Sequence, residues 1–157
     1  MVLLYRISKT KHINDFSGEG ARLYGGRWNL KGTPVIYTSD STALATLETL
    51  VHYPLHLMPS DCSIATVKLP DNLKVFTIEP ETLPPRWWVN PAPLELAQLG
   101  QKWLEQQSTV ALVVPSSVTP QGEGRNYILN PRHPDFSGVE IIQVAKYDYD
   151  KRLFKSS

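Results

Sequence analysis

The chain has 157 residues, 41% of them hydrophobic and 20% charged, which is typical of one globular domain and excludes collagen-like and intrinsically disordered proteins. Sixteen basic residues against 15 acidic ones give a net charge of +1, too small a field to gather DNA or RNA, so no direct nucleic-acid binding is expected. With one cysteine, Cys62, no signal-peptide pattern and no long apolar run, we expect a cytoplasmic protein without an internal disulfide or membrane contact.

The first half of the chain predicts two strands and a helix. Val2–Ser8 and Val35–Thr38 have the composition of strands. The polar residues 39–42 offer N-caps for a helix that continues to about His52, and Pro54 prevents its extension. Four further strands are expected later in the chain, at Cys62–Leu69, Leu73–Thr77, Thr109–Val114 and Val139–Tyr147.

Between these later strands lie a proline-rich segment and a second helix. Pro80–Pro93 contains five prolines with Trp87 and Trp88, which predicts an ordered loop packed on the body of the protein. Apolar residues then recur at helical spacing to about Gln107, and Leu96, Leu99 and Trp103 are expected in the core. These elements predict a single α/β domain over residues 1–157, with a mixed central sheet and surrounding helices.

The first helix carries a carboxylate among apolar side chains. At ~100° per residue, Leu47 and Val51 lie on one flank of Leu44, and Glu48 falls at roughly +40°, inside the same arc. Burying a carboxylate without partners is costly, so Glu48 should face a cation or a cavity. Two interpretations follow, a structural salt bridge with Arg27 and a lined pocket.

Two arginines are candidates for binding an anion. Arg27 lies in the segment 25–29, Gly-Gly-Arg-Trp-Asn, where the glycines allow a ligand or another backbone segment to approach closely. A guanidinium donates bidentate hydrogen bonds that suit phosphates. The alternative is a hairpin turn with a surface arginine stacked on Trp28. Arg6 either faces solvent or adds a second guanidinium, which would suit a pyrophosphate.

Polar side chains also follow the later strands. Ser116 comes after Val113–Pro115, and strand ends often line pockets, so it could bind a ribose or a phosphate; capping of a turn is the alternative. The segment 126–134 holds hydrogen-bonding side chains between prolines. The four histidines and Cys62 lack metal-ligand spacing and there is no glycine-rich phosphate loop, so no metal is expected.

Taken in order, seven short motifs resemble the RES domain, a family named for arginine, glutamate and serine. The resemblance spans roughly Leu3 to Phe154, and it implies a fold similar to ADP-ribosyltransferases. The motifs are Tyr5-Arg6-Ile7, Gly20-Ala21-Arg22, Gly25-Gly26-Arg27-Trp28-Asn29, Pro34-Val35-Ile36-Tyr37, Leu47-Glu48-Thr49-Leu50-Val51-His52, Val114-Pro115-Ser116 and Asn126-Tyr127-x-x-Asn130-Pro131-x-His133-Pro134.

RES proteins are toxins of bacterial toxin–antitoxin pairs, partnered by an Xre-type antitoxin with a helix-turn-helix. They consume NAD⁺. The resemblance therefore implies that this chain breaks the nicotinamide–ribose bond and arrests growth, with NAD⁺ as substrate and no cofactor. The site residues that it implies are Arg27 and Glu48 as catalytic groups, and Arg6, Tyr37, Ser116 and Asn126 as groups that bind substrate.

The residue chemistry is compatible with this activity. A carboxylate such as Glu48 can stabilise an oxocarbenium-like state, Arg27 can hold the pyrophosphate, and Tyr37 can stack on a ring of the substrate. Hydrolysis, phosphorolysis and transfer of ADP-ribose to a protein all remain open as outcomes. A non-catalytic nucleotide-binding or partner-binding module is a further alternative, which the carboxylate argues against. Trp87 and Trp88, if exposed, would be anchors for a homo-oligomeric interface.

Overall fold

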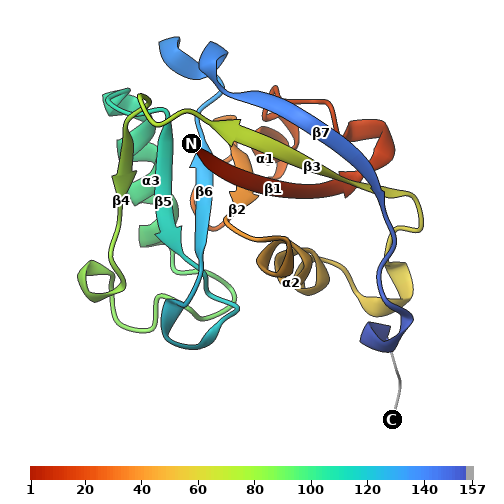
Figure 1. Cartoon of the computed structure of the whole chain (residues 1–157). Helices are drawn as coiled ribbons and strands as arrows, with labels where there is room; N and C mark the ends of the chain where they lie inside the picture. Colours follow the sequence, from red (N-terminus) through yellow and green to blue (C-terminus); the bar gives the residue numbers. More distant parts are fainter. Residues whose placement is uncertain (155–157) are drawn as a thin grey trace.

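A computed structural model describes residues 1–154, which form one seven-stranded sheet with the order β4-β5-β6-β2-β1-β3-β7 (Figure 1). The strands are β1 (Val2–Lys9), β2 (Ile36–Ser39), β3 (Cys62–Leu69), β4 (Val75–Thr77), β5 (Ala111–Pro115), β6 (Arg125–Leu129) and β7 (Glu140–Tyr147). The α-helices are α1 (Glu19–Tyr24), α2 (Thr42–His52) and α3 (Leu94–Gln106). Short 3₁₀ turns complete the chain at η1 (Thr10–His12), η2 (Leu55–Leu57), η3 (Pro80–Thr82), η4 (Pro120–Gly122), η5 (Pro134–Gly138) and η6 (Lys151–Phe154).

The sheet is mixed, which confirms the expected fold class. β4 pairs with β5 in parallel, and the other neighbours pair antiparallel. The expected domain limits include residues 155–157, which lie outside the described part of the chain, so these limits stay a prediction.

The sheet consists of two groups of strands joined at one narrow point. β1 pairs with β2 only through Tyr5 and Ser39, whereas β1 pairs with β3 along its whole length. In Figure 1 the strands β4, β5, β6 and β2 are drawn upright, with β6 antiparallel to β5 and β2, and β1, β3 and β7 run across them. α2 follows β2 directly and contacts both β2 and β1, so it lies at the junction of the two groups.

The two faces of the sheet carry two separate hydrophobic clusters. The first contains Leu112, Val114 and Ile128 from β5 and β6, covered by α3 through Leu96 and Trp103. Leu129, the neighbour of Ile128 on β6, belongs to the second cluster, because successive side chains of a strand point to opposite faces. The face of any polar residue on these strands can therefore be deduced from its position in the alternation.

The backbone of helix α3 packs directly against the backbone of the turn at residues 26–29, with no space for a side chain between them at Gly100. A Cβ atom added at Gly100 would lie 1.7 Å from the carbonyl oxygen of Trp28, so only glycine fits at this position. Trp28 is 3% exposed and belongs to the first cluster. The turn that carries Arg27 is thus fixed against α3.

Most of the expected elements are confirmed, including the ordered loop at 80–93. Ser41 is the N-cap of α2, where its hydroxyl accepts a hydrogen bond from the backbone N–H of Leu44. The expectation that Leu99 lies in the core is wrong, because its side chain is 36% exposed. Leu47 and Val51 are also exposed, since only Leu44 and Ala45 of α2 are buried against the sheet. β6 and α1 were not expected.

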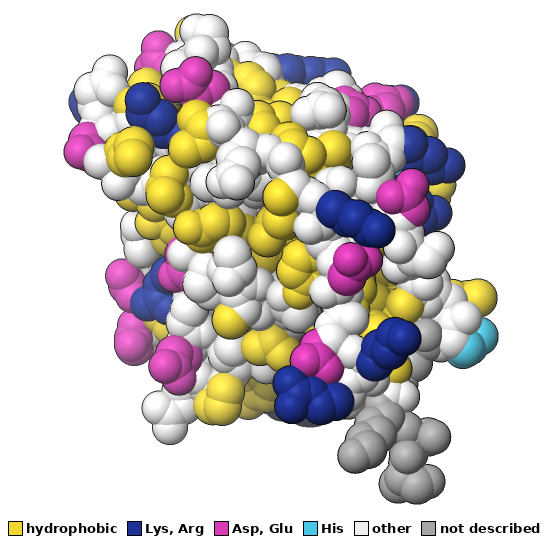
Figure 2. All heavy atoms as spheres, turned by 45° about the vertical axis from the view of Figure 1, so that its right-hand side comes forward, with side chains coloured by type: hydrophobic (Ala, Val, Ile, Leu, Met, Phe, Trp, Pro, Cys, Tyr) yellow, Lys and Arg dark blue, Asp and Glu magenta, His cyan; other side chains and the backbone are white. Residues whose placement is uncertain are grey.

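Charges of both signs share the surface. On the face shown in Figure 2, acidic and basic side chains are interspersed, with hydrophobic side chains exposed between them. None of the helices within residues 1–154 is long and apolar enough to span a membrane.

The close approach of α3 to the Trp28 carbonyl predicts a stability defect. Gly100→Ala should lower the free energy of unfolding by about 3 kcal/mol, because the added methyl group overlaps backbone that cannot move without disturbing the core. Gly20→Ala is the matched control, since a Cβ atom there meets nothing within 4 Å, and it should raise stability by about 0.5 kcal/mol. Urea unfolding measures both, and equal stabilities for the two variants would contradict the packing described.

Candidate active site

Glu48 is half-buried on α2 and is held by two neutral donors. Its Oε1 accepts a hydrogen bond from Ser116 Oγ at 2.9 Å and another from Asn126 Nδ2 at 2.7 Å. Its second oxygen, Oε2, accepts no hydrogen bond from any residue in the range 1–154, nor is it among their buried unsatisfied atoms. The carboxylate is therefore oriented by one oxygen and open to a ligand at the other.

Strand register brings these partners to one end of the sheet. Asn126 on β6 lies opposite Ser39 on β2 and opposite Val114 on β5, and Ser116 follows two residues after Val114. Residues two apart on a strand share a face, so Ser116 continues the face that carries Val114. α2 begins three residues after Ser39, which places Glu48 beside the same strand ends.

Ser39 fixes the orientation of the Asn126 amide. Its hydroxyl donates to Asn126 Oδ1 at 2.8 Å, so the Nδ2 group must point the other way, toward Glu48. Ser39 is 4% exposed. The sequence did not indicate this residue, because its role depends on the pairing of β2 with β6, a strand that the sequence did not predict.

Ser116 caps a turn, which was one of its two interpretations from sequence, and it also contacts Glu48. It is fully buried, and its hydroxyl accepts a hydrogen bond from the backbone N–H of Val118 at 3.2 Å while it donates to Glu48. The serine thus caps the turn after β5 and orients the carboxylate. Its contact with substrate stays a prediction.

Arg27 binds backbone carbonyls instead of the carboxylate. Nη1 donates to the carbonyl of Trp87 at 2.9 Å and Nη2 to that of Val89 at 3.0 Å. Burial lowers the pKa of Arg27, while the negative charge of Glu48 opposes that shift. The salt bridge with Glu48 considered from sequence is absent among the described residues, and stacking on a surface Trp28 is excluded by that side chain's burial.

Tyr37 braces the turn that carries Arg27. Its hydroxyl donates to Asn29 Oδ1 at 2.6 Å and accepts a hydrogen bond from the backbone N–H of Trp28 at 3.1 Å. Burial raises the pKa of Tyr37, so the phenol stays protonated and keeps donating. Asn29 in turn donates to the carbonyls of Ala21 and Thr33. The expected stacking of Tyr37 on a substrate ring stays a prediction.

Arg6 lies apart from the Glu48 cluster, which consists of Glu48 with Ser116, Asn126 and Ser39. Leu4, two residues earlier on β1, belongs to the second hydrophobic cluster, so strand alternation puts Arg6 on the face opposite to Ser39. Its guanidinium donates to the carbonyl of Ile13 at 3.0 Å and lies 5.7 Å from the ring centre of Phe16. Burial lowers its pKa. The structure therefore places Arg6 on the sheet face opposite to Ser39, and its binding of substrate stays a prediction.

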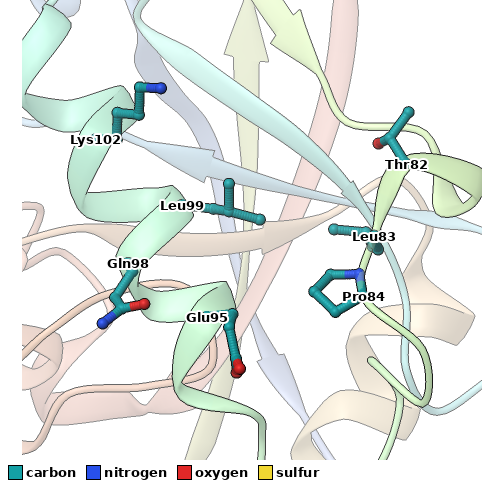
Figure 3. Close-up of a pocket in the computed structure, with 7 residues that line it drawn as sticks. All are labelled: Thr82, Leu83, Pro84, Glu95, Gln98, Leu99 and Lys102. Carbon is teal, nitrogen blue, oxygen red and sulfur yellow. The ribbon is translucent and has the colours of Figure 1, made fainter.

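A surface groove lies elsewhere, between α3 and the segment 82–84 (Figure 3). In it Leu99 points across toward Leu83 and Pro84, and none of its lining residues belongs to the Glu48 cluster. Residues 1–154 contain no group of three or more histidine, cysteine or acidic residues that could hold a metal ion.

Comparisons with known proteins agree on one family. A family model described as "RES domain" matches residues 3–151. The chain is 35% identical to a protein of Sphingobium sp. (strain YBL2) named "Prs ADP-ribosylating toxin", over 96% of this chain and 93% of that one. It is 36% identical to "Toxin Res" of Yersinia enterocolitica, over 97% and 99% of the two chains. A chain of the structure titled "Crystal structure of the M.tuberculosis MbcT-MbcA toxin-antitoxin complex" superposes with a TM-score of 0.75 at 19% identity, covering 98% of this chain and 86% of that one, and it shares the fold.

The contacts of Arg27 predict protection of the loop that follows Arg86. In Arg27→Ala the carbonyls of Trp87 and Val89 lose a charged donor, so the exposed bond after Arg86 should be cut by trypsin several times faster. Arg22→Ala is the control, because Arg22 pairs with Glu19 at the surface. Limited proteolysis followed by mass spectrometry measures both rates. Equal cleavage after Arg86 in the two variants would show that Arg27 does not hold this loop.

Proposed function

We propose that this chain, which belongs to the RES domain family, is the toxin of a bacterial toxin–antitoxin pair and consumes NAD⁺ by breaking its nicotinamide–ribose bond. The observation that carries the proposal is the arrangement of Glu48, whose Oε1 is held by Ser116 and Asn126 while Oε2 accepts no hydrogen bond from the described residues. The two neutral donors fix the carboxylate without cancelling its charge, whereas a carboxylate in a structural salt bridge would have a cation beside it.

Glu48 suits the chemistry of this bond. Cleavage of an N-glycosidic bond develops positive charge on the ribose, and a fixed carboxylate stabilises that charge or accepts a proton from a ribose hydroxyl or an attacking acceptor. The two donors on Oε1 hold the group in place before the reaction, so little reorganisation is needed. Because nicotinamide leaves as a neutral molecule, no second acidic residue is required.

Arg27 suits the pyrophosphate. Two of its five N–H donors bind the carbonyls of Trp87 and Val89, which leaves three for a ligand. These carbonyls are neutral, so the positive charge is not cancelled by an ion pair within the described residues. The pKa of Arg27 responds to Glu48, so the two charges lie within interaction range of each other. Together they match a substrate in which an anionic pyrophosphate adjoins a ribose.

Transfer of ADP-ribose to a protein is the second candidate. It is favoured by the relative named "Prs ADP-ribosylating toxin", which matches nearly the whole chain. The same carboxylate and arginine would serve, with a protein side chain in place of water or phosphate as acceptor. The partner that restrains the toxin is, in this proposal, an Xre-type helix-turn-helix antitoxin, and NAD⁺ use places the pair in the cytoplasm.

A substitution at position 48 tests the carboxylate alone. Glu48→Gln keeps the shape and an oxygen for Ser116 and Asn126 but removes the charge, so kcat for nicotinamide release from NAD⁺ should fall about 10³-fold. Glu95→Gln, in the groove on α3, is the matched control and should leave kcat unchanged. Chromatography of released nicotinamide gives the rates, and circular dichroism checks the fold. Full turnover by Glu48→Gln would remove Glu48 from the mechanism.

The same assay identifies the acceptor. Wild-type protein is incubated with NAD⁺ in buffer alone, with inorganic phosphate and with candidate proteins, and the products are separated as ADP-ribose, a phosphorylated ADP-ribose and labelled protein. We expect nicotinamide release in at least one arm. A wild-type protein that binds NAD⁺ yet releases none in any arm would instead be a binding module.

Ser39 tests the positioning of the amide. Ser39→Ala removes the donor to Asn126 Oδ1, so the amide can turn and Glu48 loses a partner; kcat should fall about tenfold or more while KM changes little. Ser39→Thr retains a hydroxyl and should restore most of the rate. If both variants lose activity equally, Ser39 acts through packing and not through the amide.

A further inference from the structure

The two adjacent tryptophans of the loop before α3 have opposite environments. Trp87 is 6% exposed and belongs to the first hydrophobic cluster, whereas Trp88 is 55% exposed. Their rings meet edge to face, with centroids 6.0 Å apart. The buried ring thus anchors the exposed one, and a broad indole surface faces solvent at a fixed place.

Arg27 fixes the backbone on both sides of Trp88. Its guanidinium binds the carbonyl of Trp87, which precedes Trp88, and that of Val89, which follows it. One planar fork therefore holds the two peptide groups that flank this residue. A side chain presented from such a backbone loses little conformational entropy when it contacts a ligand.

The loop that carries Trp88 borders the Glu48 cluster. A Cβ atom added at Gly122 would lie 3.3 Å from the ring of Trp87, and Gly122 belongs to the turn that follows Ser116. The backbone N–H of Ser116 is also bonded to the carbonyl of Gly124 in that turn. Arg27, which holds the loop, is close enough to Glu48 for the carboxylate to affect its pKa. The loop that carries Trp88 is therefore connected to Glu48 in two ways, through Arg27 and through the turn beside Ser116.

We propose that Trp88 is a binding residue on which a planar heteroaromatic base of the dinucleotide stacks while Arg27 receives the adjacent phosphate. This inference rests on the proposed function. Stacking suits an indole because every base offers a π face, and truncation of such a contact to alanine weakens nucleotide binding substantially. A phosphate and a base are joined through one ribose in a nucleotide, so a tryptophan and the arginine that is hydrogen-bonded to its loop can bind both.

Binding measurements separate this contact from catalysis. All variants are made in the Glu48→Gln background to prevent turnover, and the dissociation constant for NAD⁺ is measured by calorimetry. Trp88→Ala should raise this constant about tenfold, and Trp88→Phe, which keeps a flat ring, should raise it by much less. Phe76→Ala is the matched control, since Phe76 is an exposed aromatic residue on β4, and it should bind NAD⁺ like the parent.

Two fragments of NAD⁺ identify which of its bases stacks on Trp88. ADP-ribose lacks nicotinamide and nicotinamide mononucleotide lacks adenine, so the probe whose affinity falls in Trp88→Ala contains the stacked ring. Quenching of tryptophan fluorescence by that probe should disappear in Trp88→Phe, because the other tryptophans are buried.

The inference is overturned if Trp88→Ala binds NAD⁺, ADP-ribose and nicotinamide mononucleotide with the affinities of the parent, or if Trp88→Phe is as weak as Trp88→Ala. Failure of the wild-type chain to bind any of these probes would instead overturn the proposed function. In the wild-type background, Trp88→Ala should raise KM for NAD⁺ with little effect on kcat, which a general disturbance of the fold would not produce.

Discussion

The pairing of β2 with β6 is the constraint on which the candidate site depends. It sets Asn126 opposite Ser39, so that one hydroxyl orients one amide, and that amide holds Glu48. β2 also leads directly into α2, which carries Glu48, and it supplies Tyr37, whose hydroxyl braces the turn of Arg27. A shift of this register by one residue would turn both Tyr37 and Ser39 to the other face of the sheet, and both charged groups would lose their support.

The charges of the site are held by neutral groups. Glu48 is bound by a hydroxyl and an amide, and Arg27 by two carbonyls, although the two charges lie close enough to interact. A direct ion pair would satisfy both groups and leave nothing for an anionic substrate or a developing positive charge. Neutral partners reduce the cost of partial burial and preserve both charges for a ligand. This separation favours a working site over a structural salt bridge.

Local sequence patterns predicted most of the secondary-structure elements, but they did not predict the contacts between residues that lie far apart in the sequence. Strand alternation and helical spacing identified eight of the ten strands and α-helices, all but β6 and α1, together with the unusual placement of Glu48. β6 escaped because Arg125–Leu129 begins with polar residues that the chain pattern assigns to a loop. The face of Arg6 could not be deduced, since alternation says which residues share a face but not which face meets the site. The hydrogen bonds of Arg27 to the carbonyls of Trp87 and Val89 join residues about sixty positions apart, and no rule of sequence spacing predicts such a contact.

Two roles are therefore assigned to Arg27, and a loss of activity on its substitution can result from the loss of either one. Its fork holds the loop of Trp88, and in the proposed function its remaining donors bind the pyrophosphate. Lysine at this position would keep the charge, but a single ammonium lacks the fixed planar fork that spans two carbonyls, so the loop would loosen while the attraction for phosphate persisted. A weak Arg27→Lys variant would then report lost positioning of Trp88 more than lost charge. If such a variant were taken as evidence for a phosphate contact alone, the contribution of Arg27 to the position of the Trp88 loop would be overlooked.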